Sequence, residues 1–178
     1  MTTDTMPEVK RFIFEPEHEI FRESFRKFIE REVAPHAPRW REAGQVDREI
    51  YRQAGDNGFL LMWAEERYGG AAVDDFRYEQ IMIEENSWHG ESGLFLTLHS
   101  RLVGPYLGEL GNEAQKTRFL PGCVRGDTIL AIAMTEPDAG SDLAGIKTRA
   151  ERDGDDWVLT GSKLYNLQWT ARDSSPIS

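Results

Sequence analysis

The chain of 178 residues has little of several things, and each shortage excludes a class of protein. Cys123 is the single cysteine, so no internal disulfide can form and a disulfide-stapled scaffold is excluded. The longest stretch without Asp, Glu, Lys or Arg is Ser92–Ser100, far short of the ~18–20 residues that span a bilayer. Acidic residues outnumber basic ones by 31 to 21, and the net charge of −10 argues against binding of a nucleic-acid backbone.

Targeting, nucleotide-binding and metal-binding motifs are also missing. Met1–Lys10 lacks the apolar core of a secretory signal, which together with the lone cysteine favours a cytoplasmic protein. The sequence contains neither a Gly-x-Gly-x-x-Gly turn nor a Walker A loop, so a Rossmann or P-loop nucleotide site is not supported. Cys123 has no sequence sign of activation, and we expect a buried structural thiol. The histidines form no metal-ligand pattern, and we expect surface or capping roles and no metal site for His18, His36, His89 and His99.

What is present describes a folded, mainly helical chain. Apolar residues make up 39% and aromatic residues 11%, which is enough for a packed core. Helical periodicity and capping signals predict about five helices before residue ~125. The expected helices are Pro16 to Val33–Pro35, Asp47–Asn57 with Asp47 as N-cap, Asp74 or Asp75 to Trp88, Gly93–Leu107, and Glu113–Val124 interrupted at Pro121 and closed by Gly126.

After Gly126 the pattern changes from helix to strand. Ile129–Met134 is a short apolar run that predicts a strand. Thr148–Arg152 and Trp157–Thr160 flank Asp153-Gly154-Asp155, which predicts a hairpin. So small a piece of sheet is marginal by itself.

The segment from Thr135 to Asp142 is the strongest candidate for chemistry. Pro137 cannot donate to a strand ladder and turns the chain out of the sheet. The small residues Ala139, Gly140 and Ser141 then allow close backbone approach and expose N–H groups of the kind that bind anions. From spacing alone, an ordinary strand followed by a turn is the favoured interpretation of these residues.

Thr135-Glu-Pro-Asp-Ala-Gly-Ser-Asp142 closely resembles the signature of the acyl-CoA dehydrogenase family, although Asp138 stands where that family commonly has Gly. The resemblance covers about residues 12–163. Its other elements are Phe12–Pro35, the Tyr68-Gly69-Gly70 turn, and Gly111-Asn-Glu-Ala-Gln-Lys-x-Arg-Phe-Leu-Pro121. Two further motifs, Glu32-Val-Ala-Pro-His36 and Trp40-x-x-Ala-Gly-Gln-Val46, are most similar to the long-chain branch.

The resemblance implies a mainly α fold, with a helical N-terminal domain followed by the truncated start of a middle β-barrel domain. We expect an N-terminal tail over residues 1–11, the helical domain over 12–127, the incomplete β domain over 128–163 and a non-family tail over 164–178.

The resemblance also implies FAD as cofactor and a fatty acyl-CoA as substrate. Residues 132–141 would line FAD, with the Met134 backbone and the Thr135 hydroxyl at the flavin ring. Ser141 would lie near the cofactor phosphates and the acyl-CoA chain. The cofactor-binding set is therefore Ile132, Ala133, Met134, Thr135, Gly140 and Ser141, with Ser141 also binding substrate. The implied reaction is the α,β-desaturation of fatty acid β-oxidation, with an electron-transfer flavoprotein as oxidant and a homotetramer as the assembly.

The family's catalytic Glu lies downstream of this chain's last residue, so we expect no catalytic base here and no activity from the chain alone. Glu136 belongs to the flavin motif and is not expected to act as the base. After Lys163 the family continues with an aromatic residue, Ile, Ser or Thr, then Asn-Gly, and this chain does not. A one-base insertion or deletion near codon 163 would explain this, because one coding string for Leu164–Thr170, shifted by a base, encodes Tyr-Ile-Thr-Ser-Asn-Gly.

Two alternatives stay open on the sequence. The helical half could be a non-catalytic module that binds acyl-CoA or a partner. The chain could also derive from an acyl-CoA oxidase-like flavoenzyme, which shares the fold and differs in oxygen access to the flavin.

Overall fold

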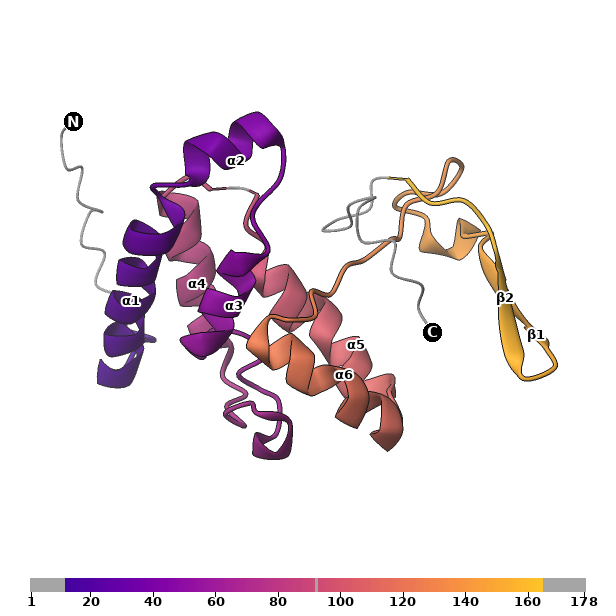
Figure 1. Ribbon diagram of the computed structural model, residues 1–178, viewed down its shortest axis with the longest axis horizontal. Helices are drawn as coiled ribbons and strands as arrows, with labels where there is room; N and C mark the ends of the chain where they lie inside the picture. Colours follow the sequence, from indigo (N-terminus) through magenta and orange to yellow (C-terminus); the bar gives the residue numbers. More distant parts are fainter. Residues whose placement is uncertain (1–11, 92, 165–178) are drawn as a thin grey trace. The chain divides into compact units, whose positions relative to one another are not determined.

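The computed structural model describes residues 12–91 and 93–164, which divide into two compact units between Ile129 and Leu130 (Figure 1). The first unit is helical, and the second contains an antiparallel hairpin. The expected N-terminal tail and residues 165–178 of the expected C-terminal tail lie outside the described residues. The mainly α fold class is confirmed.

The helical unit is built from six α-helices and shorter helical turns within the described residues. In chain order these are α1 (Pro16–Phe28), the π-turn η1 (Ile29–Val33), α2 (Ala37–Ala43), α3 (Glu49–Asp56), the 3-10 turn η2 (Glu66–Tyr68), α4 (Phe76–Trp88), the π-turn η3 (Leu98–Val103), α5 (Gly104–Leu110) and α6 (Glu113–Arg125).

The first helix begins and ends as its sequence signals predict. Pro16 occupies the first turn, where its missing N–H costs nothing, and the Glu15 N–H donates to Nδ1 of His18 at 3.1 Å. The helical path continues through η1, where the Ala34 N–H donates to the Ile29 carbonyl at 2.8 Å. This bond spans five residues, so the turn contains one residue more than an α-helical turn. Both Ile29 and Val33 are fully buried.

Three helix predictions need correction. The predicted helix at Asp47 begins at Glu49, because the Asp47 carboxylate accepts from the Arg39 guanidinium and does not cap. In place of the helix expected from Gly93, the chain forms the π-turn η3, and the regular α-helix α5 begins only at Gly104. Pro121 does not interrupt α6, which continues to Arg125. The short helix α2 was not predicted at all.

The helical unit contains a buried aromatic cluster between α1 and the loop that follows α3. The Phe25 and Phe59 rings meet edge to face with centroids 5.0 Å apart, and Phe28 and Phe59 lie 5.3 Å apart. All three side chains are buried. Phe25 and Phe28 lie on one face of α1, and this face therefore sets where α1 packs.

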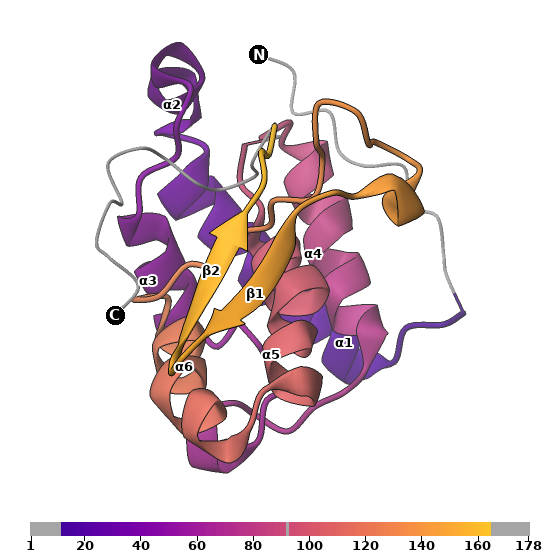
Figure 2. The same ribbon diagram turned by 90° about the vertical axis from the view of Figure 1, so that its right-hand side faces the viewer.

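Helices α1 and α4 lie side by side (Figures 1 and 2) and are joined by ion pairs. Glu85 of α4 is fully buried, and its carboxylate accepts from Arg26 at 2.8 Å and from Arg22 at 3.0 Å. Arg22 also donates to Glu84 at 3.0 Å. Burial raises the pKa of the Glu85 carboxyl, but its bonds to Arg26 and Arg22 outweigh this and lower it below its usual value.

The second unit contains a two-stranded antiparallel sheet made of β1 (Arg149–Asp153) and β2 (Asp156–Thr160). Gly154 turns the chain with a φ of 63°, as the predicted hairpin requires. The register pairs Arg152 with Trp157 and Ala150 with Leu159. The strand predicted over Ile129–Met134 does not form among the described residues, where this segment pairs with neither strand of the hairpin and only Ile132 is a bridge residue.

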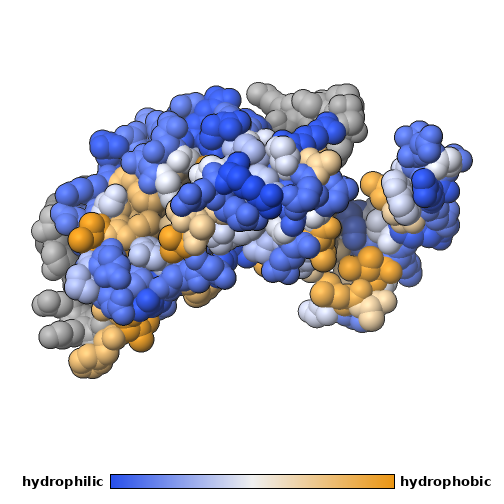
Figure 3. Space-filling view, turned by 90° about the horizontal axis from the view of Figure 1, so that it is seen from below, coloured by the Kyte–Doolittle hydropathy of each residue, from blue (hydrophilic) through white to orange (hydrophobic). Residues whose placement is uncertain are grey.

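Both units leave large apolar side chains exposed, and Figure 3 shows apolar patches on an otherwise hydrophilic surface. In the helical unit, Leu102, Tyr106 and Leu110 are each at least half exposed and recur every fourth residue along η3 and α5. In the hairpin, Trp157 and Leu159 are 65% and 75% exposed and share one face. Such stripes are typical of surfaces that other protein segments cover.

Candidate functional site

The predicted cofactor segment, residues 132–141, folds around a tight turn. The Glu136 N–H donates to the Ala139 carbonyl at 2.8 Å, and the Ala139 N–H donates back at 3.3 Å. Pro137 and Asp138 form the exposed tip of this turn, while Ala139 is buried beneath it. The turn reverses the chain, so that residues 134–135 and 140–141 form its two arms.

The buried polar side chain of this segment is Glu136, which is 5% exposed. Its Oε2 accepts from the Lys147 N–H at 2.7 Å, and its Oε1 accepts from the Thr148 N–H at 2.9 Å and from Lys163 Nζ at 3.0 Å. Hydrogen bonds from Thr148, the Lys147 backbone and Lys163 lower the pKa of this carboxyl to about 2. A carboxylate held in this way is a poor proton acceptor at neutral pH, which makes Glu136 a structural group.

The chain after the hairpin returns to the same segment. Lys163 Nζ donates to the Met134 carbonyl at 3.2 Å, and the Leu164 N–H donates to the Thr135 carbonyl at 2.8 Å. These bonds bring residues 163–164 alongside residues 134–135, far away in the sequence. No feature of the sequence pattern indicated this role for Lys163.

The six predicted cofactor residues are accessible to different degrees. Met134 is 39% exposed, and Thr135 is half-buried. Ala133, Gly140 and Ser141 are exposed, and Ile132 is half-buried. The structure therefore brings an apolar side chain, two hydroxyls and an exposed glycine backbone to one segment, and which of them touch a cofactor stays a prediction.

This donor set suits a flavin nucleotide. The Thr135 and Ser141 hydroxyls can donate to ring oxygens or phosphates, and small residues let a phosphate approach the backbone. A Cβ added at Gly140 would meet no atom within 4 Å, so the space beside this backbone is open to a ligand. The chemistry of the segment and the space beside it therefore fit FAD.

The helical unit has a separate cavity of about 240 Å³ near the end of α4. Its lining is Phe25, Met82, Ile83, Asn86, Ser87, Leu94, Phe95, Leu96 and Thr97. This volume is below the ~300–1,000 Å³ usual for a complete small-molecule site, so it suits part of a chain-like ligand. Sequence reasoning missed this cavity, because its lining comes from three segments with no shared motif.

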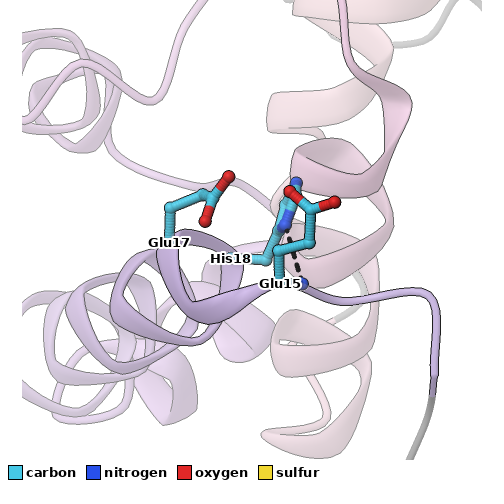
Figure 4. Close-up of side chains that lie close together, drawn as sticks. All are labelled: Glu15, Glu17 and His18. Carbon is cyan, nitrogen blue, oxygen red and sulfur yellow. Dashed lines mark hydrogen bonds between the residues drawn. The ribbon is translucent and has the colours of Figure 1, made fainter.

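His18, His99 and Cys123 have structural roles, but the surface or capping role expected for His99 is wrong, because its side chain is fully buried. Figure 4 shows His18 beside Glu15 and Glu17, three groups close enough to hold a metal ion. Nδ1 of His18 accepts from the Glu15 N–H, however, and its Nε2 lies 3.3 Å from an Asp75 carboxylate oxygen. Both ring nitrogens are thus engaged, and His18 caps α1 as one of the roles we expected for the histidines.

The buried thiol predicted at Cys123 is confirmed. Cys123 is fully buried, and burial raises the pKa of its thiol to about 12. Nε2 of the buried His99 lies 3.0 Å from the Cys123 carbonyl oxygen, and burial lowers the pKa of this imidazole to about 4. Both groups are therefore neutral at pH 7. Among the described residues, no helix is both long and apolar enough to cross a bilayer.

Comparison with known proteins identifies two domain families. Residues 15–127 match the acyl-CoA dehydrogenase N-terminal domain, and residues 131–168 match the acyl-CoA dehydrogenase middle domain. The mitochondrial long-chain specific acyl-CoA dehydrogenase of Sus scrofa is 46% identical over 155 residues, which are 87% of this chain and 36% of that protein. The chain thus spans about a third of the length of such relatives.

Solved structures give the same result. A crystal structure of an acyl-CoA dehydrogenase from Geobacillus kaustophilus matches with a TM-score of 0.83 and 44% identity, over 88% of this chain and 41% of that one. An acyl-CoA dehydrogenase from Bacillus anthracis complexed with FAD matches with a TM-score of 0.76 and 30% identity, over 86% of this chain and 27% of that one. The chain therefore belongs to the acyl-CoA dehydrogenase family, and it contains the helical N-terminal domain and the start of the middle domain.

Proposed function

We propose that this chain forms the flavin-facing part of an FAD-dependent dehydrogenase that desaturates fatty acyl-CoA. The observation that supports it most directly is the segment from Met134 to Ser141, a turn built on the buried Glu136 with hydroxyl groups and open space beside Gly140. The long-chain specific relative supports a fatty acyl thioester as substrate and β-oxidation as the setting.

When bound, the flavin supplies the acceptor for the hydride that leaves the β-carbon of the acyl thioester. The chain's own residues would orient the cofactor and exclude water from it. The Thr135 hydroxyl would donate a hydrogen bond to the bound flavin and help to orient it, and the apolar Met134 side chain would exclude water from it. Ser141 would donate to a phosphate or to the acyl-CoA.

Proton abstraction needs a base that the described part of this segment does not supply. Glu136 is buried and its two oxygens accept three hydrogen bonds, so it cannot reach a substrate proton. We therefore propose that the 178-residue chain binds FAD but does not turn over acyl-CoA by itself. An acyl-CoA assay with an electron-accepting dye would detect turnover and contradict this. An electron-transfer flavoprotein as the physiological oxidant and a homotetrameric assembly belong to the same proposal.

The test of FAD binding is a titration of the cofactor with the full chain, followed by flavin fluorescence. Gly140→Val adds a side chain into the open space and should weaken binding by about tenfold or more while leaving the fold intact. Glu151→Val places the same residue on the exposed strand β1 and serves as the control. Equal affinity for wild type and Gly140→Val would contradict the proposed site.

The cavity near α4 favours a second candidate, a helical module that binds an acyl chain without catalysis. Its lining residues Met82, Leu94 and Leu96 are apolar and buried. Calorimetric titration with acyl-CoA separates the two functions. Leu96→Trp would fill the cavity, and it would abolish the heat of acyl-CoA binding only if the acyl group binds in this cavity. Binding of FAD unaffected by Leu96→Trp would keep the first candidate intact.

A further inference from the structure

The ammonium group of Lys163 links both sides of Thr135 within the cofactor segment. Nζ donates to the Met134 carbonyl at 3.2 Å and to Glu136 Oε1 at 3.0 Å. The Lys163 side chain is 23% exposed and that of Glu136 only 4% exposed, so this ion pair is largely withdrawn from water. Removing one partner of such a pair strongly destabilises the local structure, because the charge of the other partner stays buried without compensation.

Backbone N–H groups also hold this stretch in place. The carboxylate of Glu136 accepts from the N–H groups of Lys147 and Thr148, and the Thr135 carbonyl accepts from the Leu164 N–H. The carbonyls of residues 134 and 135 and the side chain of Glu136 are thereby all engaged with segments distant in the sequence. What stays exposed on this stretch is the Met134 side chain, at 39%.

We infer that Glu136 and Lys163 are positioning residues, which hold the main chain of Met134 and Thr135 in the conformation that receives the flavin ring. The inference rests on the proposed function, since it concerns the way in which the chain presents this segment to FAD. The pair also has an electrostatic role. Lys163 offsets the charge of Glu136, and an uncompensated carboxylate beside a flavin would oppose the electrons that reduction adds.

The first experiment measures amide hydrogen exchange in the full chain without cofactor. Lys163→Met should speed exchange of the Thr148 and Leu164 amides by about tenfold, the loss expected for one charge-assisted hydrogen bond. Lys163→Arg keeps the donor and the charge and should restore protection. Lys27→Met is the matched control, because its ammonium pairs with the exposed Glu23 at 2.7 Å on α1 and lies outside the cofactor segment. Unprotected Thr148 and Leu164 amides in the wild type would overturn the inference.

The second experiment measures FAD affinity and flavin reduction potential in the same four proteins. Lys163→Met should weaken FAD binding by about tenfold and make the bound flavin harder to reduce, and Lys163→Arg should reverse both effects. Lys27→Met removes the same unit of charge from an exposed pair on α1 and should change neither property. A wild type that binds FAD, with Lys163→Met equal to it in affinity and potential, refutes the positioning role alone. A wild type that binds no FAD refutes the proposed function, and the inference with it.

Discussion

Removing the carboxylate of Glu85 should destabilise the helical unit more than any surface charge change. Glu85 is fully buried, and Arg22 beside it has only 13% of its side chain exposed. Glu85→Gln keeps the size of the side chain but leaves the two arginines without their shared anion. Breaking a buried pair costs ~3–5 kcal/mol, and the partial exposure of Arg26, at 42%, reduces our expectation to about 2–3 kcal/mol.

The assay is urea unfolding of the full chain followed by far-ultraviolet circular dichroism. With a slope of ~1–3 kcal/mol per molar urea, the expected loss lowers the midpoint by about 1–2 M. Glu23→Gln is the control, since Glu23 pairs with Lys27 at 2.7 Å in an exposed (i, i+4) pair worth at most ~0.5 kcal/mol. A Glu85→Gln midpoint that matches the Glu23→Gln midpoint would refute the reasoning that this pair joins α1 to α4.

Further predictions concern packing, acid stability and thiol reactivity. Gly55→Ala should cost roughly 1–3 kcal/mol in the same urea assay, because its Cβ would lie 2.5 Å from the Arg125 backbone, and a wild-type midpoint would contradict the close approach of α3 and α6. His99 has a folded pKa of about 4 against an ordinary ~6.5, so the folded state binds fewer protons and stability should fall as pH drops through this window, by up to roughly 3 kcal/mol. His99→Gln, which cannot titrate, should flatten that part of the pH profile, and an unchanged slope would count against a buried neutral imidazole. The Cys123 thiol should resist iodoacetamide in the folded chain and react in urea, whereas rapid alkylation of the native chain would show that it is accessible.

The sequence predicted best those helices whose ends carry side-chain caps. Asp75 accepts from the Arg77 N–H at the start of α4, and Asn112 accepts from the Gln115 N–H at the start of α6. These are local interactions, and residue type alone indicates them. The hairpin could be predicted equally well, because Gly154 adopts the positive φ that a tight turn between its two strands requires.

The elements that sequence reasoning missed depend on distant contacts. Helix α2 has few apolar residues, and only Ala37 and Trp40 of it are buried, so no helical periodicity marked it. The segment Ile129–Met134 had the residue types of a strand, but among the described residues it joins neither β1 nor β2. Residue types indicate strand propensity but do not decide which segments pair.

The candidate site shows the same division. The motif from Thr135 to Asp142 could be found from the sequence, because its small residues and proline stand together. The bonds that shape it come from the main chain of Lys147 and Thr148 and from the side chain of Lys163. Main-chain donors leave no signature in residue type, so the burial of Glu136 could be established only from the structure.

The most direct test of the account is to map FAD onto the chain by nuclear magnetic resonance. FAD added to the isotope-labelled full chain should shift the amide signals of Met134, Thr135, Gly140 and Ser141, and should leave those of the cavity residues Asn86 and Leu96 in place. Shifts confined to the cavity residues, or no shifts at saturating FAD, would contradict the claim that residues 132–141 are the flavin-binding segment.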